Sequence, residues 1–191
     1  MMTTRKTLPD ILNDEEAKRL IDLPNKRYFT GLRNKAIIAL MLNTGLRVSE
    51  IANLKTNSID LANRTLKVVN GKGHKDRNID EIGPQTIELL KQWIKKRAGG
   101  PYLFHKKDTR PLRREDIFLF VTRYAKRAGI DKHVYPHTLR HTFATNFYRQ
   151  TKDIETLRKL LGHSDISTTQ IYVTLANIDV KNAMKNYREI I

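Results

Sequence analysis

Four side chains in the C-terminal third of the sequence have types and spacings that could act together on an anion. His137 and Arg140 are three residues apart, His163 follows 26 residues after His137, and Tyr172 comes nine residues later. Residues three apart share one face of a helix, so His137 and Arg140 can donate hydrogen bonds to one small target. The planar fork of arginine suits phosphate oxygens, and a tyrosine phenol can serve as a covalent nucleophile. The pattern predicts a phosphate held by cations while a tyrosine attacks it.

The composition favours a polyanionic partner. The 191 residues contain 36 Lys and Arg against 20 Asp and Glu, a formal charge of +16. Nucleic acid is the expected partner, although a solvated basic surface is the simpler alternative, because net charge governs steering and solubility. The absence of cysteine excludes disulfides and thiolate metal sites and fits a reducing compartment. No apolar run approaches the ~20 residues needed to span a bilayer and no signal peptide is evident, so we expect a cytoplasmic protein without a membrane partner.

A further cation follows a strongly apolar segment. Residues 31–44 are apolar on nearly every side in their second half, which predicts a buried helix, and Gly45 stands where a left-handed C-cap is expected. Arg47 would then be anchored at the end of a buried element, a suitable place for a catalytic cation. The alternative is an ordinary surface pair between Arg47 and Glu50, three residues on.

A predicted hairpin carries another candidate. Residues 65–69 and 77–82 read as two strands joined by a glycine-rich turn. Lys72 lies at its tip, from which it could reach DNA. Alternatively Lys72 is an ordinary surface lysine of the turn. It would then be interchangeable with Lys75 and Arg77 as a contact to the DNA backbone. The GxxxxGK[ST] spacing of nucleotide-binding loops is absent.

Several motifs in order point to a known family. They are HTLRH at 137–141, LGHSDISTTQIY at 161–172, GLRVSE at 45–50 and GKGHKDR at 71–77. Together they resemble the tyrosine recombinase (phage integrase) family, and most closely its Xer-like site-specific recombinases. The resemblance covers roughly residues 8–190.

This resemblance implies roles for individual residues. Tyr172 would attack a DNA phosphodiester, giving a 3′-phosphotyrosyl intermediate, and Lys72 would protonate the leaving 5′-oxygen as general acid. The transition-state charge would be stabilised by Arg47, Arg140, His137 and His163. Strand exchange and religation would follow without ATP, metal or cofactor. The alternatives are type IB topoisomerase-like strand relaxation and a non-catalytic DNA-binding regulator.

The resemblance also implies partners. We expect double-stranded DNA at specific recombination sites, a homotetramer on DNA and a monomer when free, in the nucleoid of a prokaryote. A predicted helix over 113–128 has a basic outer face that could contact DNA phosphates, although such faces are often only solvated. Its candidates are Arg113, Arg114, Arg123, Lys126 and Arg127.

The predicted fold is α+β and mainly helical, with helices around a small three-stranded antiparallel sheet. We expect an extended lead-in over 1–12, then a single catalytic domain over 13–191, with a core to about 176 and a C-terminal helix over 178–191. The resemblance further leads us to expect that the DNA-clamping domain that precedes the catalytic domain in the family is absent here, so that the chain is either a fragment or a minimal integrase. Residues 102–104 are the expected third strand. Further helices are expected at 13–23, 48–54, 84–97, 137–150 and 154–161.

Three side chains receive local interpretations. His141 is expected to serve packing, because no further ligand accompanies the His137–His141 pair at zinc-enzyme spacing. Trp93 is expected in the core. Ser167 is expected to cap a short helix that carries Tyr172.

Overall fold

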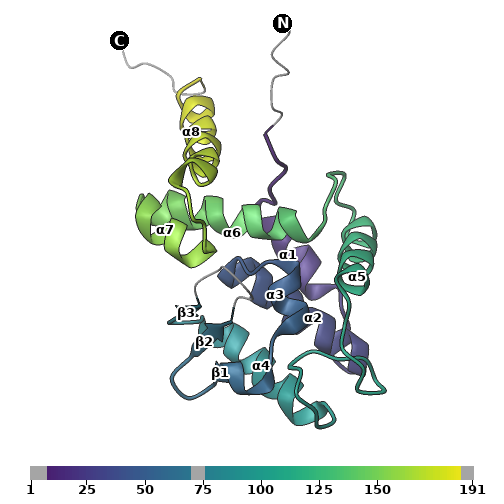
Figure 1. Cartoon of the computed structure of the whole chain (residues 1–191). Coiled ribbons are helices and arrows are strands. Elements are labelled where there is room, and N and C mark those ends of the chain that lie inside the picture. The colour runs from purple at the N-terminus through teal and green to yellow at the C-terminus, as the bar shows by residue number, and fades with distance from the viewer. Residues whose placement is uncertain (1–7, 70–75, 186–191) are drawn as a thin grey trace, which may run out of the picture.

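The computed structural model describes residues 8–69 and 76–185, with side chains described as far as residue 178. Its helices are α1 (Asp14–Asp22), α2 (Phe29–Thr44), α3 (Val48–Asn53), α4 (Pro84–Lys96), α5 (Arg114–Arg127), α6 (Pro136–Thr151), α7 (Ile154–Leu161) and α8 (Gln170–Lys185). Short 3₁₀ helices lie at η1 (Thr56–Ser58) and η2 (Ile166–Thr168), and the strands are β1 (Ile59–Asp60), β2 (Thr65–Val68) and β3 (Arg77–Ile79). The predicted class is confirmed: helices surround a small antiparallel sheet (Figure 1).

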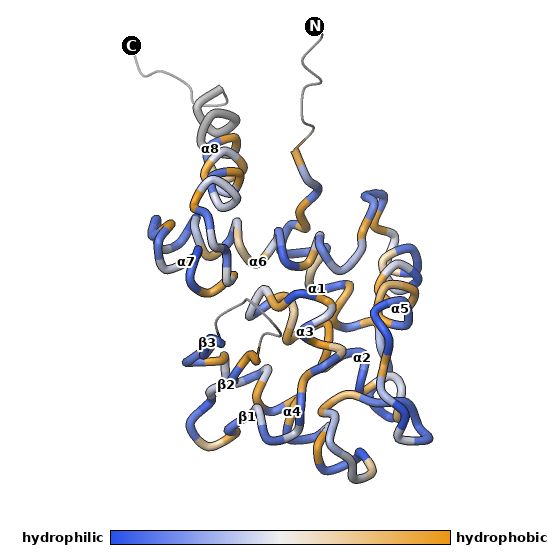
Figure 2. The backbone as a smooth tube through the Cα atoms, in the orientation of Figure 1, coloured by the Kyte–Doolittle hydropathy of each residue, from blue (hydrophilic) through white to orange (hydrophobic). Residues whose placement is uncertain are grey.

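A large hydrophobic core is built around α2. This helix packs against α1, α4 and α6, and Ile37, Ile38, Leu40 and Met41 are fully buried. Trp93 from α4 is also fully buried, as predicted, and its indole nitrogen donates to the carbonyl of Leu103 at 2.8 Å. Figure 2 shows the hydrophobic segments gathered between the helices, with hydrophilic segments at the loops.

A second, smaller cluster joins the last three helices. It contains Ala144 from α6, Leu157 and Leu161 from α7, and Tyr172 and Leu175 from α8. Helix α6 belongs to both clusters, because Leu139 near its start packs in the large core. In Figure 1, α6 lies between the part that holds the sheet and the part formed by α7 and α8. The junction of the two clusters is where the candidate site is found.

A capping box opens α1. Asn13 accepts from the backbone of Glu16, and Glu16 accepts from the backbone of Asn13, both at 2.8 Å. The preceding residue, Leu12, donates its backbone N–H to Thr142 Oγ1 at 2.9 Å, which fastens the start of the chain to α6.

The predicted hairpin is confirmed, but its expected third strand is wrong. Strands β2 and β3 pair antiparallel with Leu66 opposite Ile79. The third strand is β1, which pairs with β2 so that the order is β1-β2-β3. Asp60 accepts backbone hydrogen bonds from Ala62 and Asn63, both at 2.9 Å, and so forms a tight turn. Because the turn is short, the pairing of β1 with β2 loses little chain entropy. Tyr102 forms only an isolated bridge.

The C-terminal helices also differ from prediction. One continuous helix, α8, carries Tyr172 and runs on to Lys185, where we expected a short helix and then a separate one from 178. Residues 173–177 contain neither glycine nor proline, so nothing stops the helix between them. The 3₁₀ helix before it is capped by Asp165, whose side chain accepts from the Ser167 N–H at 2.8 Å; Ser167 itself is not the cap. Residues 186–191 lie outside the described part of the chain.

Candidate active site

The end of α2 places Arg47. Gly45 has φ +65° and donates its N–H to Met41 O at 3.0 Å, which confirms the predicted left-handed cap. A Cβ added to Gly45 would lie 2.4 Å from the ring of Phe143, so a side chain is excluded there. Helix α3 begins at Val48, with Arg47 as its N-cap residue. The guanidinium is therefore held between two helices.

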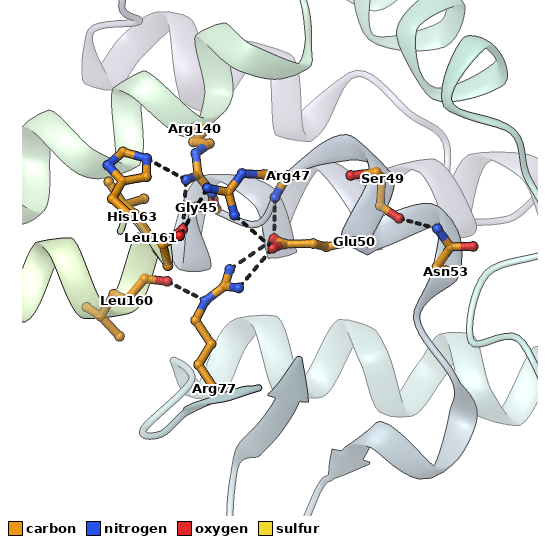
Figure 3. Close-up of polar contacts among 11 residues, drawn as sticks. Gly45, Arg47, Ser49, Glu50, Asn53, Arg77, Arg140, Leu160, Leu161 and His163 are labelled. Atoms are coloured by element: carbon orange, nitrogen blue, oxygen red, sulfur yellow. Dashed lines mark hydrogen bonds and ion pairs between the residues drawn. The ribbon is translucent and has the colours of Figure 1, made fainter. Parts of the chain in front are cut away.

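A carboxylate links Arg47 to the sheet (Figure 3). Glu50 accepts from the Arg47 backbone N–H at 2.7 Å and from Arg47 Nη1 at 3.1 Å. It also accepts from both terminal nitrogens of Arg77, at 2.8 and 2.9 Å. Both interpretations of Arg47 thus hold in part: it pairs with Glu50, and it also lies in the cationic cluster.

Arg77 has a different place from the one predicted. Its side chain is 9% exposed, and its Nε donates to Leu160 O at 2.7 Å while both terminal nitrogens bond Glu50. The structure does not support a DNA backbone contact by Arg77, because the guanidinium faces inward. It fastens β3 to α3 and to the end of α7 instead. Sequence reasoning missed this role because Leu160 lies 83 residues away.

Arg140 lies at the centre of the cluster. The residue is 4% exposed, and it donates to Gly45 O at 2.6 Å and Leu161 O at 2.8 Å. These carbonyls belong to the C-terminal ends of α2 and α7, where the helix dipole favours a cation. Burial and the charge of Arg47 lower the pKa of Arg140 to about 10, so the group stays charged at neutral pH.

His163 lies directly against Arg140. It follows Gly162, which ends α7 with φ +63°, and its Nε2 lies 2.9 Å from Arg140 Nη2. Arginine can only donate, so Nε2 is the acceptor there and Nδ1–H faces Thr169 Oγ1 at 3.1 Å. Burial and the charges of Arg140 and Arg47 lower the pKa of His163 to about 4, which makes it neutral at pH 7.

Tyr172 approaches this cluster from α8. Its residue is 2% exposed, and it belongs to the smaller hydrophobic cluster. Burial raises the pKa of the phenol, while the charges of Arg140 and Arg47 and a hydrogen bond to Arg140 oppose that rise. The candidate nucleophile therefore lies beside the candidate phosphate-binding arginine in the same molecule.

His141 has a contact that the sequence did not indicate. Its Nδ1 lies 3.1 Å from the hydroxyl of Tyr172, so the interpretation as a packing residue alone is wrong. The sequence had paired His141 with His137 only as a possible metal site. The sequence feature that could have indicated this contact is the position of His141 directly after Arg140, in the same helix.

His137 lies at the edge of the cluster. The residue is exposed in the first turn of α6, and its ring centroid is 6.4 Å from that of His141. Partial burial lowers its pKa, and the positive charges of Arg140 and Arg47 lower it further. A neutral imidazole at the rim is free to contact a phosphate that arrives from solvent.

Comparison with known proteins identifies the family. Residues 10–177 match the profile of the phage integrase family. This chain belongs to the phage integrase family. It is 35% identical over 189 residues to tyrosine recombinase XerD of Staphylococcus haemolyticus, covering 95% of this chain and 63% of that protein. It is 39% identical over 184 residues to tyrosine recombinase XerA of Pyrococcus furiosus, covering 94% and 62%. The integrase-family chain therefore spans less than two thirds of these relatives.

Solved structures share the fold. The crystal structure of XerA recombinase superposes with a TM-score of 0.84 at 31% identity, covering 100% of this chain and 68% of that one. A XerH site-specific recombinase bound to palindromic difH substrate, in a post-cleavage complex, has a TM-score of 0.78 at 26% identity and covers 95% and 55%.

The other residues predicted for this integrase-family chain are only partly placed. Lys72 and Lys75 lie outside the described residues. The five basic residues of the α5 region are exposed: Arg113, Arg114, Arg123, Lys126 and Arg127. Arg114 and His137 both line a hollow of about 460 Å³ between α5 and the start of α6, whose wall also includes Phe118, Leu119 and Tyr135. Their DNA contacts stay predictions.

The described part of the chain holds neither a metal-type cluster of side chains nor a helix of membrane-spanning character. Between residues 8 and 69 and between 76 and 185, no three His, Cys, Asp or Glu side chains gather as a metal site would require. Over the same residues, no helix has the length and apolar character needed to cross a membrane.

Proposed function

We propose that this chain is the catalytic part of a tyrosine-type site-specific DNA recombinase. The observation that carries the proposal is the meeting of the Tyr172 phenol with Arg140, Arg47 and His163 in one buried cluster. The relatives support it, since they are named tyrosine recombinases and one was solved with cleaved DNA substrate.

The cluster suits displacement at a phosphodiester. The non-bridging oxygens gain charge during attack, and cations fixed beforehand stabilise that charge selectively in the transition state. By analogy with an oxyanion-hole donor, loss of Arg47 or Arg140 should slow cleavage about 10²–10³-fold. Tyr172 would form the 3′-phosphotyrosyl link, and Lys72 would protonate the leaving 5′-oxygen. Attack by the 5′-hydroxyl of a second strand would reverse the step, so ATP and metal are not needed.

The burial of Tyr172 sets a condition for activity. A DNA strand can reach a side chain that is 2% exposed only if the surrounding elements separate. We propose that DNA binding moves the elements that cover the Tyr172 hydroxyl, because the strand must reach that oxygen. Such a shift fits an enzyme that cleaves only on assembly.

The expected partners and organisation form part of the same proposal. We propose that residues 13–191 act as a single catalytic domain on double-stranded DNA at specific sites. A tetramer would form on DNA and a monomer would exist when free, as a DNA-associated cytoplasmic protein. Phosphate contacts by Lys75 and by the basic face of α5 would hold the duplex across the site.

Trapping the covalent intermediate tests the proposal. A nicked duplex that loses a short 5′-terminal fragment on cleavage should accumulate a protein–DNA adduct that survives denaturing electrophoresis. Tyr172→Phe should bind the same duplex and form no adduct. Transfer of the cleaved strand to a second duplex would separate recombination from type IB relaxation. Tight binding without an adduct from the unaltered chain would contradict the proposal and favour a DNA-binding regulator.

A further inference from the structure

We infer that His141 takes the phenol proton of Tyr172 as the tyrosine attacks DNA, and returns it when the link is reversed. This inference rests on the proposed function. Its basis is geometric: His141 Nδ1 lies 3.1 Å from the Tyr172 hydroxyl, within the reach that proton transfer requires. Because Arg140 can only donate to the Tyr172 hydroxyl, we assign the hydroxyl proton to the bond with His141, with Nδ1 as acceptor and the imidazole proton on Nε2.

The other two imidazoles of the site do not fit this role. His163 has Nε2 engaged with Arg140 at 2.9 Å and Nδ1 engaged with Thr169 at 3.1 Å. His137 is exposed at the rim, with its ring next to those of Tyr135 and His141. Among the imidazoles in the described part of the site, His141 is the one in hydrogen-bonding contact with the nucleophile.

The surroundings of His141 make it responsive to substrate. It faces His137 and Arg140 from α6, Tyr172 from α8 and His163 beyond α7. Burial and the charges of His137 and Arg140 lower its pKa to about 4, so it is neutral and has a free lone pair at pH 7. A phosphate bound to Arg140 would offset the positive charge beside it and raise its basicity. DNA binding would therefore make the imidazole a better base when one is needed.

The step balances without a further reagent. The phenol oxygen forms a bond to phosphorus, the bond from phosphorus to the 5′-oxygen breaks, and the phenol proton moves to His141 Nδ1. The 5′-oxygen takes its proton from a separate donor, which the proposed function assigns to Lys72. In the reverse step the phenol leaves phosphorus and recovers its proton from His141.

A substrate with a bridging 5′-sulfur separates the two proton transfers. A thiolate leaves without protonation, so a defect in the general acid should disappear on this substrate, whereas a defect in the base should persist. Single-turnover adduct formation would be measured for His141→Gln, which keeps a hydrogen-bond acceptor but cannot take the proton, and for His141→Phe. His133→Gln, at an exposed histidine on the loop before α6, is the matched control.

We expect both His141 variants to form adduct about 10²-fold more slowly at pH 7 on either substrate, with the control unchanged. The deficit should shrink as pH rises, because hydroxide then removes the phenol proton. The quantity compared is the ratio of a variant's rate at high pH to its own rate at pH 7. A sample that is partly unfolded lowers both rates alike, so it does not change this ratio. Unchanged DNA affinity would show that substrate binding is intact.

Four results would overturn the inference. Adduct formation by His141→Gln at the unaltered rate would show that no proton passes to His141. A faster rate would show that the hydrogen bond between His141 and Tyr172 restrains the tyrosine. A deficit equal at every pH would leave His141 with a positioning role only. Failure of the unaltered chain to form adduct would overturn the proposed function itself, together with this inference.

Discussion

At the scale of single residues, Glu50 is the carboxylate on which the site depends. Burial by itself raises the pKa of Glu50. The hydrogen bonds and charge of Arg77, a hydrogen bond from the Arg47 backbone and the charge of Arg140 together outweigh burial, so the pKa is lowered. Its side chain is 6% exposed. Removal of one member of a buried ion pair leaves the other charge uncompensated, which costs more than the pair itself contributes.

We expect Glu50→Gln to lower the free energy of unfolding by about 3 kcal/mol at pH 7. Glu155→Gln is the matched control, because Glu155 pairs with Arg158 at the surface, where solvent screens the pair and its loss should change stability far less. Urea unfolding of both variants measures the difference. Equal, small effects would contradict the central role of Glu50.

The same residue predicts a pH dependence. A carboxylate whose folded-state pKa lies below its unfolded value stabilises the protein fully above the unfolded value, and this contribution is lost as pH falls through the folded pKa. The difference between Glu50→Gln and the unaltered chain should therefore be constant near neutrality and shrink as pH falls below about 4.5. Unfolding measured at a series of pH values tests the sign. A difference that grows on acidification would contradict it.

Residue types and spacing identified the cluster members Arg47, Arg140, His163 and Tyr172 before the fold was known. They could not show that Arg77 turns inward, because its partners lie 27 and 83 residues away. They also missed the contact of His141, which requires the position of α8. Local patterns predict which groups are chemically able to act, whereas partners distant in sequence need coordinates.

At the scale of elements, the ends of helices place the charged groups. Helices α2 and α7 both end in left-handed glycines, Gly45 and Gly162, and their last carbonyls accept from Arg140 and Arg47. These ends were predictable because a glycine directly follows the expected helical pattern in each case. The third strand and the length of α8 were not, since short pairings and helix continuation depend on tertiary context.

We expect Gly45→Ala to cost about 3 kcal/mol of unfolding free energy, since it combines a left-handed backbone with a clash against Phe143. Gly129→Ala is the control: its φ is +63° and no heavy atom lies within 4 Å of the added Cβ, so about 1 kcal/mol is expected. Thermal unfolding of the two variants separates packing from backbone strain. Equal losses would contradict the close approach of α6 to the end of α2.

At the scale of the whole molecule, the charge of +16 should govern DNA affinity. A protein that neutralises 6–10 phosphates loses about 10³–10⁵ in affinity between 50 and 200 mM salt. The exposed cations of α5 and its N-cap are the described groups that we expect to contribute.

We expect the double change Arg113→Gln and Arg114→Gln to reduce the slope of log affinity against log salt by about two. The charge-matched control is Lys91→Gln with Lys95→Gln, on the exposed face of α4, for which we expect no change in slope. Fluorescence anisotropy with a labelled duplex measures both. Equal slope changes would show that α5 has no special contact with the DNA.

The anchoring of Arg140 by peptide carbonyls has one more consequence. Carbonyl oxygens and a neutral imidazole orient this guanidinium without cancelling its charge, and Arg47 and Arg77 share Glu50 beside it. The cluster thus keeps excess positive charge that is only partly exposed to solvent. Small oxyanions in a storage buffer, such as sulfate, can occupy it, and mass action then stabilises the native chain. The melting temperature of the DNA-free protein is therefore partly a property of its counterions.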